Sequence, residues 1–157
     1  MIKPNAHFNK ITDINVSFLK ENNIEGVILD VDNTLIDMSK KTLDGIEQWI
    51  KTMKKSNIKF CIASNSINKE KVSKIAKKLD IPFVYISVKP FKRGIKKAIE
   101  ILNIEPKHIA EIGDQLFTDV WVSNRTGLFS ILTKPISEEK FKLGKLKRKV
   151  EKWYLSK

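Results

Sequence analysis

The chain has 157 residues, 41% of them hydrophobic, which is enough for one domain with a buried core. No apolar segment approaches the roughly 18 residues that a membrane-spanning helix needs. The N-terminus lacks the apolar core of a signal peptide, and the single cysteine, Cys61, excludes an internal disulfide, so we expect a cytoplasmic protein. The net charge of +12 favours a polyanionic partner or, with equal weight, indicates a solvated lysine-rich surface.

Strands and helices are predicted to alternate along the chain. Apolar patterning predicts strands at residues 27–30, 58–63, 83–86, 109–112 and 128–132. It predicts helices at residues 42–55, 68–79, 94–102 and 119–124, with Trp49 and Trp121 on their apolar faces and therefore in the core. This alternation implies an α/β fold with a parallel sheet and right-handed crossovers. We expect one domain: a leader at 1–24 with a short helix, a core at 25–135 and a basic helix at 136–157.

Two carboxylates follow the first strand. The apolar run that begins at Val27 ends in Asp30 and Asp32, which would point toward one crevice at the carboxyl edge of the sheet. One could attack as a nucleophile while the other handles the proton. A helix-capping loop or a weak cation site is the alternative for this pair taken alone.

Further polar residues follow the other strands. Ser64 ends the second strand, Lys89 follows the third, and Asp114 and Asp119 follow the fourth. Because the carboxyl ends of parallel strands meet at one edge, these side chains can converge with the first two aspartates. Taken singly, Ser64 could be a turn former, Lys89 a surface lysine and Asp119 a helix cap.

The order of these residues resembles the haloacid dehalogenase (HAD) superfamily of phosphotransferases, and most closely its subclass IIIA, YqeG-type branch, whose members look related to phosphatidylglycerophosphate phosphatases. The matching motifs are Asp30-Val31-Asp32-Asn33-Thr34, Ser64, Lys89 and the segment from Gly113-Asp114 to Thr118-Asp119. The likeness covers about residues 24–135 and implies a Rossmann-like, three-layer α/β/α fold.

The resemblance implies a role for each motif residue. Asp30 would attack phosphorus and form an aspartyl-phosphate, and Asp32 would protonate the leaving group and then activate water. Ser64 would bind the phosphoryl group and Lys89 would neutralise its charge, while Asn33, Thr34 and Asn65 would shape the phosphate loop. The implied cofactor is Mg²⁺, with Asp30, Asp32 (through its backbone carbonyl), Asp114 and Asp119 as the metal-binding residues.

No cap domain is expected. Only 32 positions separate Asp32 from Ser64, and 25 separate Ser64 from Lys89, which leaves room for one helix and one strand in each gap. A site without a cap is open and can accept a phosphate carried on something large, such as a lipid headgroup, a protein or a nucleic-acid end.

The basic tail at 136–157 gives information about the binding partner. Apolar residues alternate with lysines at Phe141, Leu143, Leu146, Val150, Trp153 and Tyr154. A basic amphipathic helix with aromatic residues is typical of peripheral contact with an anionic membrane, here the inner face. A helix packed on the domain is the alternative, and no known nucleic-acid-binding module appears, so nucleic acid is disfavoured as a partner. The oligomeric state is left open.

Three functional hypotheses follow. The first is a Mg²⁺-dependent phosphomonoester hydrolase acting on phosphatidylglycerophosphate in phospholipid synthesis. The second is a phosphatase of the same type for a soluble phosphometabolite, nucleotide or phosphosugar. The third is a non-catalytic adaptor that keeps the fold, which the complete set of acids, serine and lysine argues against.

Overall fold

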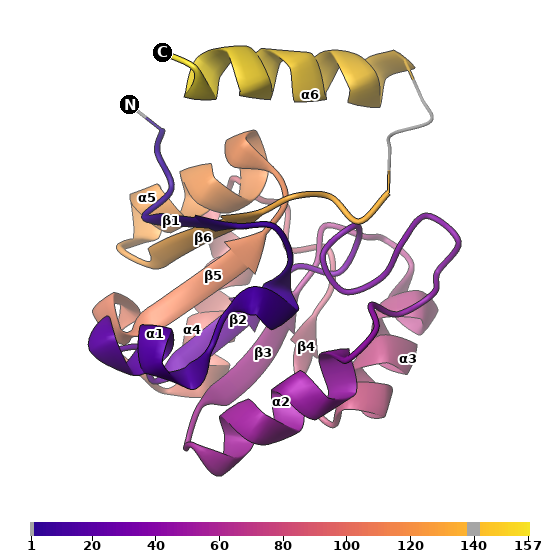
Figure 1. Ribbon diagram of the computed structural model, residues 1–157. Coiled ribbons are helices and arrows are strands. Elements are labelled where there is room, and N and C mark those ends of the chain that lie inside the picture. The colour runs from indigo at the N-terminus through magenta and orange to yellow at the C-terminus, as the bar shows by residue number, and fades with distance from the viewer. Residues whose placement is uncertain (1, 138–141) are drawn as a thin grey trace.

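A computed structural model describes residues 2–137 and 142–157. Its centre is one parallel sheet with the strand order β1-β6-β5-β2-β3-β4 (Figure 1). The strands are β1 (Ala6–Phe8), β2 (Gly26–Leu29), β3 (Lys59–Ala63), β4 (Phe83–Val84), β5 (Ile109–Gly113) and β6 (Phe129–Thr133). The helices are α1 (Val16–Glu21), α2 (Ile46–Lys55), α3 (Lys69–Leu79), α4 (Lys92–Leu102), α5 (Trp121–Thr126) and α6 (Lys142–Leu155). Shorter turns are η1 (Ile11–Asp13), η2 (Pro106–His108) and a π-helical turn, η3 (Leu116–Val120). The predicted α/β architecture is confirmed.

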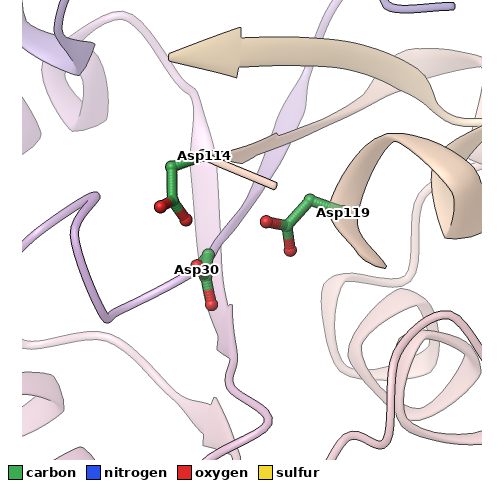
Figure 2. Close-up of side chains that lie close together, drawn as sticks. All are labelled: Asp30, Asp114 and Asp119. Atoms are coloured by element: carbon green, nitrogen blue, oxygen red, sulfur yellow. The ribbon is translucent and has the colours of Figure 1, made fainter. Parts of the chain in front are cut away.

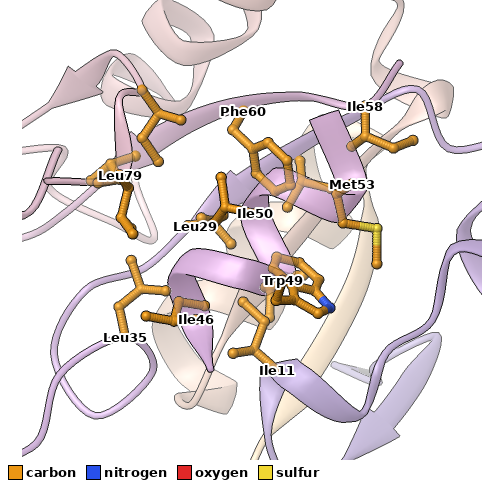
Figure 3. Close-up of a cluster of buried hydrophobic side chains, with 14 of the residues drawn as sticks. Ile11, Leu29, Leu35, Ile46, Trp49, Ile50, Met53, Ile58, Phe60 and Leu79 are labelled. Carbon is orange, nitrogen blue, oxygen red and sulfur yellow. The ribbon is translucent and has the colours of Figure 1, made fainter. Parts of the chain in front are cut away.

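Helices cover both faces of the sheet because the central strands are apolar on both sides. Val27 and Leu29 of β2 face a core shared with α1, α2 and α3, shown in part in Figure 3. Ile28 points the other way and packs with Cys61 against α4 and α5. This alternation follows from the two-residue period of a strand, and it gives the three-layer arrangement. Cys61 is fully buried, as predicted.

The leader contributes an edge strand that the sequence did not reveal. β1 pairs in parallel with β6, and Asn5 exchanges hydrogen bonds with Ser130 beside it. Three residues are too few to show a strand period, so only the pairing partner defines this element. At the opposite edge, β4 ends at Val84, and Ile86 and Val88 have positive φ angles that take the chain out of the extended conformation.

The prediction that Trp121 lies in the core is wrong, whereas Trp49 is buried as expected. Trp121 is 39% exposed at the start of α5 and lies 6.0 Å from the Arg125 guanidinium. The preceding π-helical turn η3 changes the helical phase, so Val122 and Ser123 are the buried positions of this helix.

The tail is helical from Lys142, with residues 138–141, including Phe141, outside the described part of the chain. Ile136 and Ser137 instead pair with Asn33 in the loop after β2. Among the described helices, none combines the length and apolarity needed to cross a bilayer.

Candidate active site

Three buried carboxylates meet where the strand order reverses. Asp30 follows β2, Asp114 follows the neighbouring β5, and Asp119 lies on η3. Figure 2 shows the three side chains converging, and each offers an oxygen within 4.8 Å of the others. A reversal between adjacent parallel strands opens a crevice at their carboxyl ends, which is where α/β folds bind ligands.

Lys89 supplies the positive charge inside this carboxylate cluster. Its Nζ donates at 3.3 Å to Asp30, at 3.3 Å to Glu111 and at 2.5 Å to Asp119. Asn65 fixes the lysine backbone, because its Oδ1 accepts from the Lys89 N–H at 2.7 Å and its Nδ2 donates to the Lys89 carbonyl at 3.0 Å. Asn65 therefore lies where it can set the position of Lys89.

The electrostatic balance inside the site is unusual. Burial, and next the Asp119 carboxylate, raise the pKa of Asp30 well above its usual range, while Lys89 opposes the shift. The pKa of Glu111 is raised for the same reasons. Burial disfavours the Lys89 ammonium, but the surrounding carboxylates outweigh it and the pKa of Lys89 is raised. Ionisable groups perturbed by both burial and a charged partner are typical of functional sites.

Glu111 is a site residue that the sequence reading missed. It lies in the middle of β5, is fully buried, and its second oxygen accepts from the Ser123 hydroxyl at 3.2 Å. A glutamate inside an otherwise apolar predicted strand was the available signal, since a buried carboxylate needs a partner.

Asp32 lies apart from the cluster. Its side chain is 52% exposed and pairs with Lys71 of α3 at 2.8 Å. The described carboxylates that could share a metal ion therefore include Asp30, Asp114 and Asp119 but not the side chain of Asp32. This separation leaves the Asp32 carboxylate accessible from solvent.

The loop residues predicted to hold phosphate have different environments. Thr34 is buried and its hydroxyl has no partner among the described residues, whereas the Ser64 hydroxyl accepts from the Ser66 N–H at 3.1 Å. Asn33 has a positive φ, and its Oδ1 accepts from the Ser137 hydroxyl at 2.6 Å. Asn33 and Asn65 thus hold the loops of the site together.

Helix α6 reaches the site, which the sequence reading did not foresee. Arg148 pairs with the Asp114 carboxylate and donates to its backbone carbonyl, and Glu151 accepts from the Leu116 N–H at 3.1 Å. Burial raises the pKa of Asp114 to about 6, against the opposing effect of Arg148. The helix is therefore anchored on the loop that follows β5.

The oxygen donors fit a hard divalent cation. Asp114 Oδ1 is buried and has no hydrogen-bond partner in the described part of the chain, while Oδ2 is held by Arg148. Gly113 allows Asp119 to approach, because a Cβ there would collide with the Asp119 carboxyl group. An unpartnered buried carboxylate oxygen beside two further carboxylates is the kind of donor set that Mg²⁺ prefers.

Comparison with known proteins agrees with this geometry. Residues 1–137 match the sequence model of the family described as mitochondrial PGP phosphatase. The chain is also 33% identical over 154 residues to the probable phosphatase YqeG of Bacillus subtilis, covering 98% of this chain and 89% of that protein. The chain belongs to the PGP phosphatase family. It is a phosphatase, as the sequence motifs predicted.

Solved structures support the fold of this family member. An uncharacterized protein from Listeria monocytogenes serotype 4b superposes with a TM-score of 0.60 at 18% identity, over 75% of this chain and 85% of that one. A putative HAD superfamily (subfamily III A) hydrolase from Legionella pneumophila gives 0.54 at 22% identity, over 76% and 70%. Both share the fold of this chain, and the Legionella pneumophila protein is the one described as a HAD hydrolase; neither bears on the substrate.

Proposed function

We propose that this family member is a Mg²⁺-dependent phosphomonoester hydrolase that works through an aspartyl-phosphate on Asp30. The observation that carries the proposal is the buried carboxylate cluster with the Lys89 ammonium at its centre. Phosphoryl transfer needs a positioned nucleophile and positive charge around the transferring group, which Asp30 and Lys89 would supply here.

Asp30 is the proposed nucleophile. One carboxylate oxygen would form a bond to phosphorus while the bond from phosphorus to the leaving oxygen breaks. The carboxylate must be ionised to attack, and Lys89, 3.3 Å away, favours that form. Lys89 would also neutralise charge on the phosphoryl oxygens in the transition state.

Asp32 is the proposed acid and base. It would give a proton to the leaving oxygen, and would then take one from the water that hydrolyses the aspartyl-phosphate and releases orthophosphate. Its half-exposed side chain at the outer side of the crevice suits both exchanges, because the leaving group and the water arrive from solvent.

The proposed metal-binding residues are Asp30, Asp114 and Asp119, together with the backbone carbonyl of Asp32. Bound Mg²⁺ would supply positive charge next to the phosphoryl oxygens. Thr34 and Ser64 are proposed to donate hydroxyl hydrogen bonds to the same oxygens. The Thr34 hydroxyl is the clearer candidate, because it is buried without a partner among the described residues.

We propose phosphatidylglycerophosphate as the substrate, reached at the surface of an anionic membrane. Apart from Ile101, the large exposed hydrophobic side chains of the described residues follow the carboxyl ends of strands or lie on α6, on the same side as the site. We call them the apolar rim: Met38, Ile67, Ile86, Val88, Phe91, Trp121, Leu146, Val150, Trp153 and Leu155. Exposed apolar side chains gathered at one edge of a chain with a net charge of +12 suit an anionic bilayer.

Helix α6 supports this orientation of the rim. Its polar residues Arg148 and Glu151 face the domain, while Leu146, Val150 and Trp153 are exposed. Tyr154 of the same helix packs on Phe117, with ring centroids 5.8 Å apart, so α6 is docked on the domain and still presents exposed apolar side chains. A helix that lies in a membrane interface also presents apolar side chains in this way.

Phosphate release from phosphatidylglycerophosphate in anionic mixed micelles tests the proposal, with and without Mg²⁺ and with Asp30→Asn as the control. We expect release that requires both Mg²⁺ and Asp30. A second outcome is that an aryl phosphate is hydrolysed with these two requirements while phosphatidylglycerophosphate is not hydrolysed. That outcome would support the proposed mechanism but favour a soluble substrate. Release that persists undiminished in Asp30→Asn would contradict the mechanism.

A further inference from the structure

A groove with a cationic wall lies beside the proposed active site. It has a volume of about 520 Å³ and runs between the loop after β2 and helix α3. Five of its ten lining residues are lysines: Lys40, Lys41, Lys71, Lys74 and Lys78. The buried side chains of Ile36 and Ile75 also line it, so the groove combines apolar surface with positive charge.

Three of the five lysines that line the groove are without a carboxylate partner among the described residues, while Lys71 pairs with Asp32 and Lys78 with Glu47. Glu70 is the one acidic lining residue, and Lys78 pairs with Glu47 at 3.4 Å. The ammonium groups of Lys40, Lys41 and Lys74 have no carboxylate partner within residues 2–137 and 142–157. Clustered cations with low-dielectric walls concentrate field and attract anions.

Lys71 connects the groove with the proposed catalytic residue Asp32. It lines the groove and its Nζ lies 2.8 Å from Asp32, the proposed proton donor to the leaving oxygen. The body of the leaving group must extend outward from that oxygen, past Asp32. The surface it meets there is the lysine-lined wall.

We infer that this groove binds a second negative charge carried by the leaving group of the substrate. The inference rests on the proposed function and adds to it the surface that selects the substrate: phosphomonoesters whose leaving group bears an anionic phosphate would be preferred because the groove lysines bind that phosphate. The phosphodiester of a lipid headgroup and the second phosphate of a soluble bisphosphate share this chemistry. Lys74 and Lys41 would contact the anion, and Lys71 would exchange its contact with Asp32 for one with the ligand.

Paired substrates measure this preference. Glycerol 3-phosphate has a neutral leaving group, whereas the deacylated headgroup of phosphatidylglycerophosphate has a leaving alcohol of similar chemistry that carries a phosphodiester. We expect kcat/KM to favour the charged substrate by about tenfold or more, and the ratio to fall by about tenfold in Lys74→Glu and Lys41→Glu. Lys55→Glu, the same charge change on an exposed residue of α2, should keep the wild-type ratio.

The soluble source is tested with 1,3-propanediol bisphosphate. A preference for the headgroup over this bisphosphate assigns the groove to a phosphodiester, and the reverse assigns it to a second phosphomonoester. Two results would overturn the inference. One is that the wild type has equal kcat/KM values for substrates with charged and neutral leaving groups. The other is that the ratio of these values is unchanged in both Lys74→Glu and Lys41→Glu. If no phosphoester is hydrolysed in an Asp30-dependent way, it is the proposed function that fails.

A binding measurement separates the groove from turnover. Glycerophosphoglycerol, the headgroup without its terminal phosphate, is titrated into the Asp30→Asn protein while backbone amide NMR shifts are followed. Saturable shifts at the start of α3 that disappear in Lys74→Glu but persist in Lys55→Glu support the groove. Absence of shifts there at millimolar ligand would contradict it.

Discussion

Lys89 balances the buried negative charge of the site. Its ammonium is the cation within hydrogen-bond distance of Asp30, Glu111 and Asp119. We expect Lys89→Met to lower the free energy of unfolding by about 3–5 kcal/mol at pH 8, because buried carboxylates lose their partner. The loss should shrink at pH 5, where those carboxylates can take up protons. Urea denaturation at both pH values measures this, with the exposed Lys55→Met as control; a loss equal to the control would contradict the argument.

Asp114 predicts how Mg²⁺ affinity depends on pH. Its pKa is raised from 3.8 to about 6, so below pH 6 the folded protein carries a proton that must leave when a metal binds. Affinity should therefore fall by about tenfold or more per pH unit below 6. In metal-free protein the same shift stabilises the fold fully below pH 3.8, and this contribution is lost as pH rises through about 6.

Calorimetric titration of Mg²⁺ between pH 5 and 8 checks this prediction. Asp114→Asn should bind Mg²⁺ weakly at every pH in that range. An affinity that stays constant from pH 5 to pH 8 in the wild type would show that Asp114 is not a ligand.

At the residue scale, the sequence was informative where polar side chains end apolar strands. Asp30, Lys89 and Asp114 could be found this way, because the position at a strand end carries the signal. Glu111 and Arg148 could not, since one lies within a strand and the other on a helix whose docking site is distant in sequence.

At the scale of elements, we expect loss of α6 to change the environment of Asp114 while the strand pairing of the sheet is kept. Arg148 holds Oδ2 of Asp114, while the buried Oδ1 has no hydrogen-bond partner among the described residues, so we treat Arg148 as a positioning residue for the proposed metal ligand. Arg148→Ala removes a nearby cation that lowers the pKa of Asp114. We expect the pH range in which protonation of Asp114 weakens Mg²⁺ binding to move upward.

Lys149→Ala is the matched control for Arg148→Ala, because Lys149 is the next residue of the same helix and is exposed. It should leave the pH profile of Mg²⁺ binding unchanged. If the pH dependence of Mg²⁺ affinity were the same in both variants, Arg148 would serve only to hold α6 on the domain.

The predictability of an element depended on its length and on its partners. α2, α3 and α4 carry enough turns to show a helical period, whereas the three residues of β1 do not show a strand period. The strand predicted at residues 83–86 is present but is limited to the two residues of β4. The π-helical turn η3 could not be anticipated because its buried residues do not follow the ordinary helical period.

For the whole molecule, the apolar rim predicts attachment to anionic membranes. Ile67 follows β3 and is 82% exposed, and Phe91 follows β4 and is 62% exposed. We expect Ile67→Ser with Phe91→Ser to weaken binding to vesicles of mixed anionic lipid by about tenfold or more, because each buried apolar side chain contributes about 1.5–3 kcal/mol. Vesicle sedimentation measures the partition.

Ile101 provides the control for the rim. It is 48% exposed at the end of α4, at the opposite edge of the sheet, and Ile101→Ser should bind vesicles like the wild type. Equal loss in the rim and control variants, or no vesicle binding by the wild-type chain, would contradict a membrane-facing edge.

The architecture followed from alternating strands and helices, because right-handed crossovers fix where the carboxyl ends lie. The position of α6 was not predictable, since its contacts with Asp114 and Leu116 involve polar side chains and its apolar contact with the domain includes the single ring of Tyr154 on Phe117. From the sequence alone, the apolar residues of α6 were compatible both with packing on the domain and with contact with a membrane.

Trapping the phosphoenzyme tests the central claim most directly. The protein is mixed with ³²P-labelled substrate and Mg²⁺ under conditions that release phosphate, quenched in acid within one turnover, and the labelled peptide is mapped. We predict a hydroxylamine-sensitive acyl phosphate on the peptide that contains Asp30, and no label in Asp30→Asn. Phosphate release with no labelled peptide, or with the label on another residue, would contradict Asp30 as the nucleophile.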